Sequence, residues 1–268
     1  MTDTALLAQA SVVERSSPMR NAVELVLHEQ SAAASVRPGQ FFQLAVAAPH
    51  TLLRRPYSVA WMDRMRGRIA FLFSVVGAGS AWLAQREAGD RIDLLGPLGT
   101  GFTVSRSGRP SVLVAGGLGI AAFPALVQAL NDAERQVLVL QGARTASRLL
   151  PSAWLPRASL REATDDGTRG HHGPVTDLLP AALRQESEIF ACGPMPMLRA
   201  MVRVLKQDGF PLSRVQVSLE TPMGCGMGTC LGCAAPAAAG GYLLTCREGP
   251  CLVADRIDWE QMPDAFHG

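Results

Sequence analysis

The sequence predicts a multidomain β plus α/β protein, with an antiparallel β-barrel, a parallel-sheet α/β domain and a small C-terminal domain. Three observations support this fold class. Residues 1–103 contain short strand-like runs between turn residues, and residues 104–215 alternate strand-length apolar runs with helical stretches. Residues 216–268 carry the cysteine spacing C-x4-C-x2-C-x12-C. We therefore expect domain boundaries near residues 103 and 215.

The composition excludes several classes of protein. Hydrophobic residues make up 48% of the chain and charged residues 18%, which is typical of a globular protein and not of a disordered one. The net charge is +2, with Lys and Arg scattered, so we expect no nucleic-acid partner. No apolar run approaches the roughly 20 residues of a membrane span. The first residues lack a signal-peptide pattern, and the cysteine spacing suits a reducing compartment, so we expect a cytoplasmic protein.

The barrel prediction comes from short runs that are alternating or briefly apolar, separated by Gly and Pro. Such spacing is typical of a small antiparallel barrel. The expected strands are NAVELVLHE (21–29), QFFQLAVA (40–47), PYSVAWMD (56–63), RIAFLFSVV (68–76) and DRIDLLGP (90–97).

The motif LLRRPYSVA places Arg54 and Arg55 beside Tyr57 and Ser58 on one of these strands. A guanidinium, an aromatic face and a hydroxyl in one place could hold a charged aromatic ligand. Strand arginines are also often only solvated, so both interpretations stay open.

The motif VVGAGSAWL places Gly77, Gly79 and Ser80 just before a short helical stretch. Exposed N–H groups at a helix N-terminus favour anions. A Gly-x-Gly sequence can equally be an ordinary turn.

In residues 104–215 the hydrophobic pattern predicts a parallel sheet of about five strands with helices on both faces. The expected strands are SVLVAGG (111–117), RQVLVLQGA (135–143), RASLREATDD (157–166), SEIFACG (187–193) and SRVQVSL (213–219). The expected helical stretches are IAAFPALVQALND (120–132), ASRLLPSAWL (146–155), VTDLLPAALRQ (175–185) and MPMLRAMVRVLKQ (195–207).

Ligands of such a sheet bind at the carboxyl ends of its strands. The turn AGGLGIAAFP puts Gly116, Gly117 and Gly119 there, where backbone amides can approach a diphosphate. The segment ACGP puts Cys192 at another strand end, where it is either a packing residue or a neighbour of a ring-shaped ligand.

Two adjacent histidines, His171 and His172, lie in a polar loop with Asp165 and Asp166. We do not interpret them as a metal site, because neighbours in a loop seldom present both rings to one metal and no third ligand is evident. Arg144 and Arg148 follow the second strand of the sheet. They could pair with a 2′-phosphate or be solvated residues at a helix entry.

The cysteine spacing points to an iron–sulfur cluster. Cys225, Cys230 and Cys233 lie on one glycine-rich loop, and Cys246 follows from an expected hairpin. Glycines let the loop wrap a cluster and leave N–H groups free to point at sulfur. The spacing is that of a plant-type [2Fe–2S] cluster. Structural zinc usually takes two separated C-x2-C-like pairs, and a disulfide framework does not fit a long chain with few cysteines.

Several separated motifs resemble the electron-transfer subunit of class 1B dihydroorotate dehydrogenase, within the ferredoxin-NADP reductase superfamily. The likeness runs from about Pro38 to Ile257, and its most specific part is the cysteine loop. The motifs are RRPYS, VVGAGS, LGPLGTGF, GGLGIAAFP, GARTASRLL, ATDDGTRG, VTDLL, ACGPMPML, QVSLETPMGCGMGTCLGC and TCREGPCLVADRI.

The resemblance implies three domains: an FAD-binding barrel (1–103), an NAD(P)-binding α/β domain (104–215) and a [2Fe–2S] domain (216–268). It implies flavin and phosphate contacts at Arg55, Pro56, Tyr57, Ser58, Leu72, Phe73, Ser74, Gly79 and Ser80. It implies a nicotinamide dinucleotide site at Gly116, Gly117, Gly119, Cys192, Gly193 and Pro194. The implied cluster ligands are Cys225, Cys230, Cys233 and Cys246.

Two positions depart from this pattern or add to it. Ala122 stands where related sequences often have proline in the glycine turn, which is expected to loosen that turn. Cys251 is an additional thiol near the fourth ligand, and we interpret it as structural.

The three cofactors together predict an electron relay without an acid–base residue. Nicotinamide exchanges a hydride and a cluster exchanges single electrons, whereas a flavin can do both and so belongs between them. The resemblance implies that the partner is an FMN-containing dihydroorotate dehydrogenase subunit in pyrimidine biosynthesis. One alternative is an NAD(P)H-dependent reductase that supplies an oxygenase or another redox enzyme. Another is a non-enzymatic module that has lost its cofactors.

Overall fold

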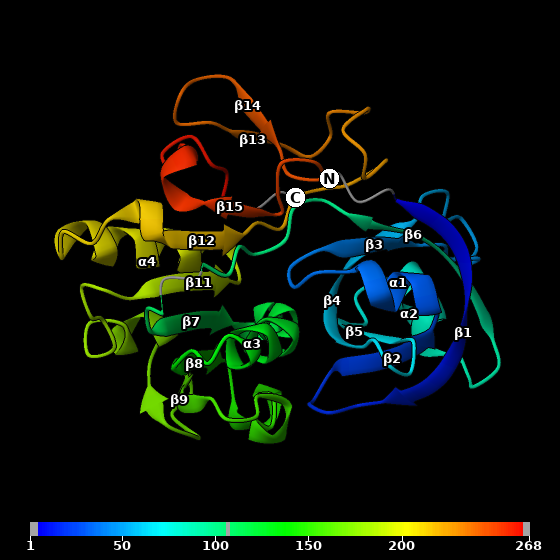
Figure 1. Ribbon diagram of the computed structural model, residues 1–268, viewed down its shortest axis with the longest axis horizontal. Coiled ribbons are helices and arrows are strands. Elements are labelled where there is room, and N and C mark those ends of the chain that lie inside the picture. Colours follow the sequence, from blue (N-terminus) through cyan, green and yellow to red (C-terminus); the bar gives the residue numbers. More distant parts are fainter. Residues whose placement is uncertain (1–4, 106–107, 265–268) are drawn as a thin grey trace.

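The computed structural model describes residues 5–105 and 108–264. Figure 1 shows two halves side by side, a barrel and an open sheet, with the C-terminal segment in orange and red lying across the top of both. This arrangement confirms the predicted fold class.

The first half is a closed barrel, to which the described residues contribute six antiparallel strands. Side chains that alternate along these strands fill its interior with buried aromatic and aliphatic groups such as Phe42, Phe71 and Leu94. Around the barrel the strands run β1 (Leu6–Ser16), β2 (Ala22–His28), β5 (Arg68–Ser74), β4 (Arg55–Asp63), β3 (Phe41–Leu44) and β6 (Arg91–Leu98). Two short helices, α1 (Gln30–Ser35) and α2 (Ala78–Ala84), lie between strands.

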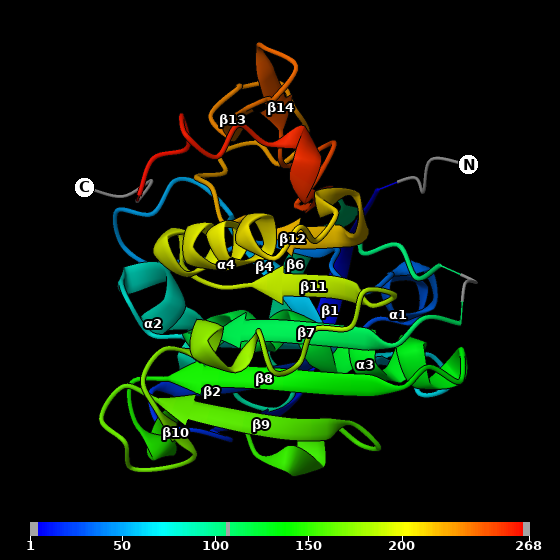
Figure 2. The ribbon, with the colours of Figure 1, turned by 90° about the vertical axis from the view of Figure 1, so that its left-hand side faces the viewer.

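The second half is a mixed sheet, in which the described residues form seven strands. Its order is β10 (His171–His172), β9 (Ser159–Thr164), β8 (Val137–Ala143), β7 (Ser111–Gly116), β11 (Glu188–Cys192), β12 (Val215–Ser218) and β15 (Cys251–Val253). All neighbouring strands are parallel except β12 and β15. Figure 2 shows these strands stacked one above another.

Helices cover both faces of the sheet. Helix α3 (Phe123–Asp132) packs on the face that carries Leu113 and Ala115 of β7. Helix α4 (Met195–Gln207) packs on the face that carries Val112 and Val114. The buried residues of α4 recur at helical spacing and form one apolar stripe, namely Met195, Leu198, Met201, Val202 and Leu205.

Two of the helix predictions made from the sequence are wrong. Residues 146–155 form only the short 3₁₀ turns Ala146–Arg148 and Ser152–Trp154, and residues 175–185 form only the 3₁₀ turn Val175–Leu178. Pro151 and Pro180 lie inside these stretches, and proline lacks the N–H that a helix interior needs. In α3 and α4 the proline stands in the first turn instead, where no N–H is needed.

Strand β1 was missed as a barrel strand, and the sheet extends beyond the five expected strands. Strand β10 adds two residues at one edge, and β15 pairs antiparallel with β12 at the other. Strand β15 belongs to residues 216–268. The C-terminal segment therefore contributes an edge strand to the sheet that the preceding part of the chain forms. The division at residues 103 and 215 stays a prediction.

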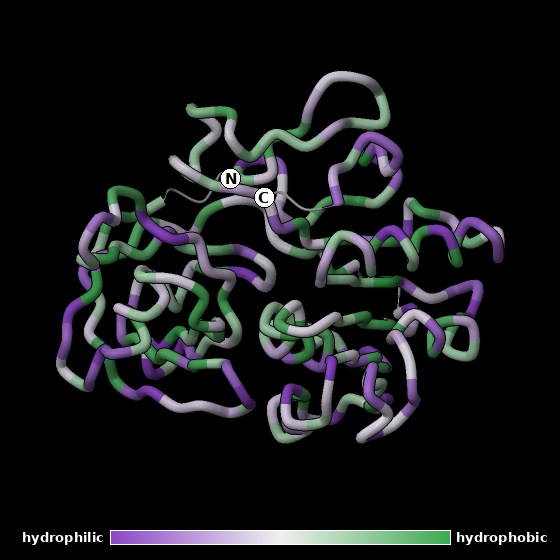
Figure 3. Tube along the Cα trace, turned by 180° about the vertical axis from the view of Figure 1, so that it is seen from behind, coloured by the Kyte–Doolittle hydropathy of each residue, from purple (hydrophilic) through white to green (hydrophobic). Residues whose placement is uncertain are grey.

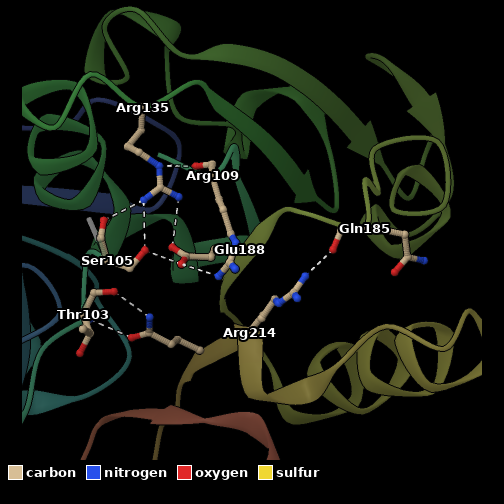
Figure 4. Close-up of polar contacts among 8 residues, drawn as sticks. Thr103, Ser105, Arg109, Arg135, Gln185, Glu188 and Arg214 are labelled. Carbon is tan, nitrogen blue, oxygen red and sulfur yellow. Dashed lines mark hydrogen bonds and ion pairs between the residues drawn. The ribbon is translucent and has the colours of Figure 1, made fainter. Parts of the chain in front are cut away.

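A polar network fastens the segment between barrel and sheet to the amino-terminal edge of the sheet (Figure 4). Buried Arg135 donates to a carboxylate oxygen of Glu188 at 3.1 Å and to the backbone oxygen of Ser105 at 3.0 Å. It also donates to the backbone oxygen of Arg109. Gln216 exchanges two 2.8 Å hydrogen bonds with the backbone of Thr103. These contacts fasten Thr103, Ser105 and Arg109 of the connecting segment to the sheet.

The C-terminal segment carries the cysteine loop and the hairpin of β13 (Ala234–Pro236) and β14 (Tyr242–Leu244). Within the described part of the chain, no helix has both the length and the apolar character that crossing a bilayer requires.

Candidate functional site

The sheet has a point at which its strand order reverses, and ligands of open α/β sheets bind there. From β7 the chain runs outward through β8, β9 and β10, and it then returns to β11 on the other side of β7. The turn after β7 and the end of β11 meet closely. A Cβ built on Gly119 would lie 2.7 Å from the backbone nitrogen of Gly193, so glycine allows this approach.

A cavity of about 630 Å³ opens at this point and extends to the barrel. All but two of the predicted flavin and nucleotide residues line it. They are Arg55, Pro56, Tyr57, Ser58, Leu72, Phe73, Ser74, Gly116, Gly117, Gly119, Cys192, Gly193 and Pro194. The structure thus brings residues of the barrel strands β4 and β5 to the same cavity as residues at the ends of β7 and β11. Their individual roles stay predictions.

The barrel wall of the cavity combines an aromatic surface with a cation. The rings of Tyr57 and Phe73 lie 5.0 Å apart between centroids. Burial raises the pKa of Tyr57 to about 12, against a smaller lowering by the neighbouring Arg55 guanidinium, so the phenol stays neutral. Arg54 instead forms a 2.8 Å ion pair with Asp93, which holds it against β6. The two adjacent arginines therefore have different surroundings.

Gly79 and Ser80 are the two predicted residues that do not line the cavity. Gly79 lies behind Arg55, since an added Cβ would come within 3.1 Å of its Nε. The Ser80 hydroxyl accepts hydrogen bonds from the backbone N–H groups of Val76 and Gly77 at 2.9 and 3.1 Å. Both residues thus shape the start of α2, and their predicted pyrophosphate role stays a prediction.

Three side chains lie in one row across the carboxyl edge of the sheet. Cys192 of β11 is in register with Ser218 of β12, which is in register with Cys251 of β15. Burial raises the pKa of Cys192 to about 12, with a smaller opposing effect of a hydrogen bond with Ser218. Burial also raises the pKa of Cys251 well above its usual value. Cys251 contacts the backbone oxygen of Gly39 at 3.6 Å, which fits a structural thiol between sheet and barrel.

Several cavity residues escaped the sequence analysis. Ser218, the last residue of β12, lines the cavity. The segment after β12 contributes Leu219, Glu220, Thr221, Pro222 and Met223, and the turn before β15 contributes Pro250. The segment after β12 could have been found, because it follows the carboxyl end of a predicted parallel strand. Pro250 could not, because no sequence pattern indicated that β15 would join the sheet.

The cysteine loop has its backbone amides aimed at sulfur. The N–H groups of Met227, Thr229 and Cys230 point at Cys225 Sγ over 3.4, 3.3 and 3.5 Å. The amide of Met227 contributes most to lowering the pKa of Cys225, to about 6. The N–H of Gly228 points at Cys246 Sγ over 3.1 Å.

Two of the four cysteines lie together at the end of the barrel. The Sγ atoms of Cys233 and Cys246 are 3.1 Å apart and pack with Phe41 and Leu98 of the barrel. Among the described residues, no three His, Cys, Asp or Glu side chains form a ready-made site for a single metal ion. Three thiols on a loop whose backbone N–H groups point at sulfur, together with Cys246 after β14, fit a two-iron cluster, whose ligands are shared between two metals. Their assignment as the ligands stays a prediction.

Of the two adjacent histidines, His171 pairs with Asp177, with 3.0 Å between Nε2 and Oδ2. Both histidines belong to the exposed edge strand β10.

The barrel, the nucleotide sheet and the cavity between them define a flavin oxidoreductase of the ferredoxin-NADP reductase type. Residues 9–102 match the oxidoreductase FAD-binding domain. Residues 220–258 match the iron–sulfur cluster binding domain of dihydroorotate dehydrogenase B. The chain belongs to the family of dihydroorotate dehydrogenase B (NAD(+)) electron transfer subunits.

Two relatives illustrate this membership. The chain is 35% identical over 240 residues to the Bacillus caldolyticus subunit, covering 87% of this chain and 91% of the relative. It is 37% identical over 231 residues to the Desulforamulus reducens subunit, covering 83% and 87%. The resemblance found in the sequence is thereby confirmed, as are the FAD-binding and iron–sulfur domains.

Solved structures share the fold. A structure of the NADH-dependent reduced ferredoxin-NADP oxidoreductase superposes with a TM-score of 0.84 at 26% identity, covering 98% of this chain and 93% of that one. The ferredoxin reductase of carbazole 1,9a-dioxygenase superposes with a TM-score of 0.71 at 27% identity, covering 81% and 70%.

Proposed function

We propose that this chain relays electrons between NAD(P)(H), FAD and a [2Fe–2S] cluster, and that it exchanges them with a separate cytoplasmic subunit that oxidises dihydroorotate in pyrimidine biosynthesis. When bound, nicotinamide supplies hydride exchange, the cluster supplies single-electron exchange, and the flavin connects the two. The chain's own task is to hold these groups in line.

The observation that carries this proposal is that two residues line the cavity and also pack against cysteines of the expected cluster. Phe41 and Met223 line the cavity, and both also pack with Cys233 and Cys246. A flavin in the cavity would therefore lie one side chain away from the cysteine cluster. This packing excludes water from the space between the two sites.

The barrel also fixes the position of the cysteine loop. Gln43 of β3 is fully buried and donates a long 3.5 Å hydrogen bond to the backbone oxygen of Gly224. Gly226 leaves room for Gln43, whose Nε2 would lie 2.9 Å from an added Cβ. A hydrogen bond between Thr221 and Thr245 ties the two ends of the loop region together.

An apolar surface around the cysteine loop suits a protein partner. Leu52 is 95% exposed and Met227 55%, and Leu53 and Leu231 are also exposed. Leu53 lies beside the loop, 3.9 Å from the position of a Gly224 Cβ. In Figure 3 the loops at the top of the molecule are mostly white to green, in contrast to the purple outer loops of the barrel. Buried apolar contact there would shorten the path from cluster to partner.

The test is purification of the native complex followed by an assay with dihydroorotate and NAD(P)+. We expect a flavin-containing partner to co-purify and dihydroorotate-dependent reduction of the nucleotide to occur. Met227→Glu combined with Leu53→Glu should weaken the complex while leaving the flavin and iron content unchanged. A matched control is Met65→Glu, because Met65 is 92% exposed on the far hairpin of the barrel.

The alternative is a reductase that supplies an oxygenase, and the likeness to the carbazole dioxygenase reductase favours it as the second candidate. No dihydroorotate oxidation by the complex, together with rapid NAD(P)H-driven reduction of an oxygenase, would overturn the first choice. An absorption spectrum of the pure protein without flavin and iron–sulfur bands would instead support the cofactor-free module.

A further inference from the structure

A fully buried amide lies beneath the cysteine loop, in surroundings that are otherwise apolar. Gln43 is on the outer face of β3, two residues after Phe41, and none of its surface is exposed. Around it, Phe41 and Leu98 of the barrel pack with two of the cysteines. An apolar side chain would suit this place, because burying a polar group without its hydrogen bonds is costly. The fold alone therefore does not account for an amide at this position.

The hydrogen bonds of this amide are incomplete. Nε2 of Gln43 donates to the backbone oxygen of Gly224 over a long 3.5 Å, and Oε1 is buried without a hydrogen-bond partner among the described residues. Reversing the amide would not help, since an oxygen in the place of Nε2 would face the carbonyl oxygen of Gly224. Nε2 carries two hydrogens, and within the described part of the chain the structure gives a partner for one of them. The amide thus has an N–H to offer.

This N–H lies against the two residues that flank Cys225. Nε2 faces the oxygen of Gly224, and it would be 2.9 Å from a Cβ added to Gly226. Gly226 has a φ of +75° and no side chain, so the loop can approach the amide closely. Three backbone N–H groups of the loop already point at Cys225 Sγ. Gln43 places a side-chain N–H at the same stretch from the barrel side.

Arg54 fixes the strand that carries Gln43. Its guanidinium donates to the backbone oxygens of Gln43 and Asp93 at 3.4 and 3.1 Å, and it forms the 2.8 Å ion pair with the Asp93 carboxylate. It therefore bridges β3 and β6 where their pairing is irregular, between Phe41 and Gln43. This bridge gives the Gln43 side chain a fixed base under the cysteine loop.

We propose that Gln43 donates an N–H to sulfur at the cysteine loop and thereby raises the reduction potential of the cluster. The inference rests on the cluster of the proposed function. Hydrogen bonds to the sulfurs are one determinant of the potential of a cluster, because an N–H dipole stabilises the additional negative charge of the reduced state. The barrel that is expected to hold the flavin would then also adjust the potential of the next group in the relay.

The test is a redox titration of the purified holoprotein, in which electron paramagnetic resonance follows the reduced cluster. Gln43→Leu and Gln43→Met are similar in size to glutamine but have no N–H. In both variants we expect the ratio of reduced to oxidised cluster at a fixed potential to fall about tenfold, which is a shift of about 59 mV to lower potential for a one-electron couple.

Gln141 offers a matched control. It is 1% exposed, its Nε2 donates a 3.3 Å hydrogen bond to the backbone oxygen of Leu150, and its Oε1 is also buried without a partner among the described residues. It differs from Gln43 in lying on β8, inside the parallel sheet between β7 and β9. We expect Gln141→Leu to lower stability and to leave the reduction potential of the cluster unchanged.

The outcomes separate this inference from the proposed function. The resonance signal comes only from loaded clusters, so a lower iron content in a variant does not prevent the measurement. An unchanged ratio in Gln43→Leu and Gln43→Met, or an equal shift in Gln141→Leu, would overturn the hydrogen bond to sulfur. If neither Gln43 variant binds a cluster after reconstitution with iron and sulfide, while Gln141→Leu does, Gln43 serves assembly and the proposal falls. A wild-type protein without a cluster signal would instead overturn the relay itself.

Discussion

Replacing Gly119 by alanine should damage the nucleotide site through the backbone of the facing loop. The added Cβ would lie 2.5 Å from the carbonyl carbon of Cys192 and 2.7 Å from the nitrogen of Gly193. Ordinary contacts begin near 3.4 Å, so the two loops must separate by about 1 Å. Both partners are backbone atoms and cannot rotate away. We expect a loss of about 1–3 kcal/mol in the free energy of unfolding.

The larger effect should fall on hydride transfer, because a displacement of about 1 Å can cost about a hundredfold in rate. The assay is rapid-mixing measurement of flavin reduction by NAD(P)H, with urea unfolding in parallel. Gly77→Ala is the control, since a Cβ at Gly77 meets nothing within 4 Å and Gly77 has an extended backbone. A Gly119→Ala protein with normal stability and a normal reduction rate would refute the close approach.

Three further predictions follow from the structure. Cys192 should resist alkylation, because its raised pKa of about 12 keeps the thiol protonated; its labelling rate, followed by mass spectrometry, should rise about tenfold per pH unit above pH 8. Complete labelling within minutes at pH 8 would contradict the raised pKa of this half-buried thiol. Arg135→Leu should lower the free energy of unfolding by about 3 kcal/mol, because it leaves the Glu188 carboxylate buried without its main partner. In urea unfolding, Glu188→Leu added to it should restore part of this loss. Cys246→Ser should lower the bound iron and sulfide, whereas Cys251→Ser should leave both unchanged; equal losses would remove the distinction between ligand and structural thiol.

The sequence was sufficient to predict the fold class because its hydrophobic periods differ between the two halves. Four strands of the parallel sheet, β7, β8, β11 and β12, are short and mostly buried, and the sequence predicts all four together with β9. The wrong helix predictions arose because one hydrophobic pattern occurs both in α-helices and in short 3₁₀ turns. Residues 146–155 and 120–132 are both apolar stretches with one proline, but Pro124 lies in the first turn of α3 and Pro151 lies inside its stretch.

The cavity residues were predictable where a sequence motif lies on a predicted strand or directly after its end. Arg55, Gly116 and Cys192 all belong to motifs at predicted strand positions, and the structure brings them to one cavity. Pro250 escaped because β15, which follows it directly, is three residues long and joins the sheet from a distant segment. Gly79 and Ser80 do not line the cavity, and their predicted contact with a pyrophosphate stays a prediction.

The measurement that tests the relay most directly is anaerobic addition of NAD(P)H to the pure chain, followed by absorption and by electron paramagnetic resonance. We expect the flavin band to bleach and the signal of a reduced cluster then to appear. We also expect the flavin to take up two electrons and the cluster one. A flavin that is fully reduced beside a cluster that stays oxidised, with dithionite then reducing that cluster, would contradict the path through Phe41 and Met223.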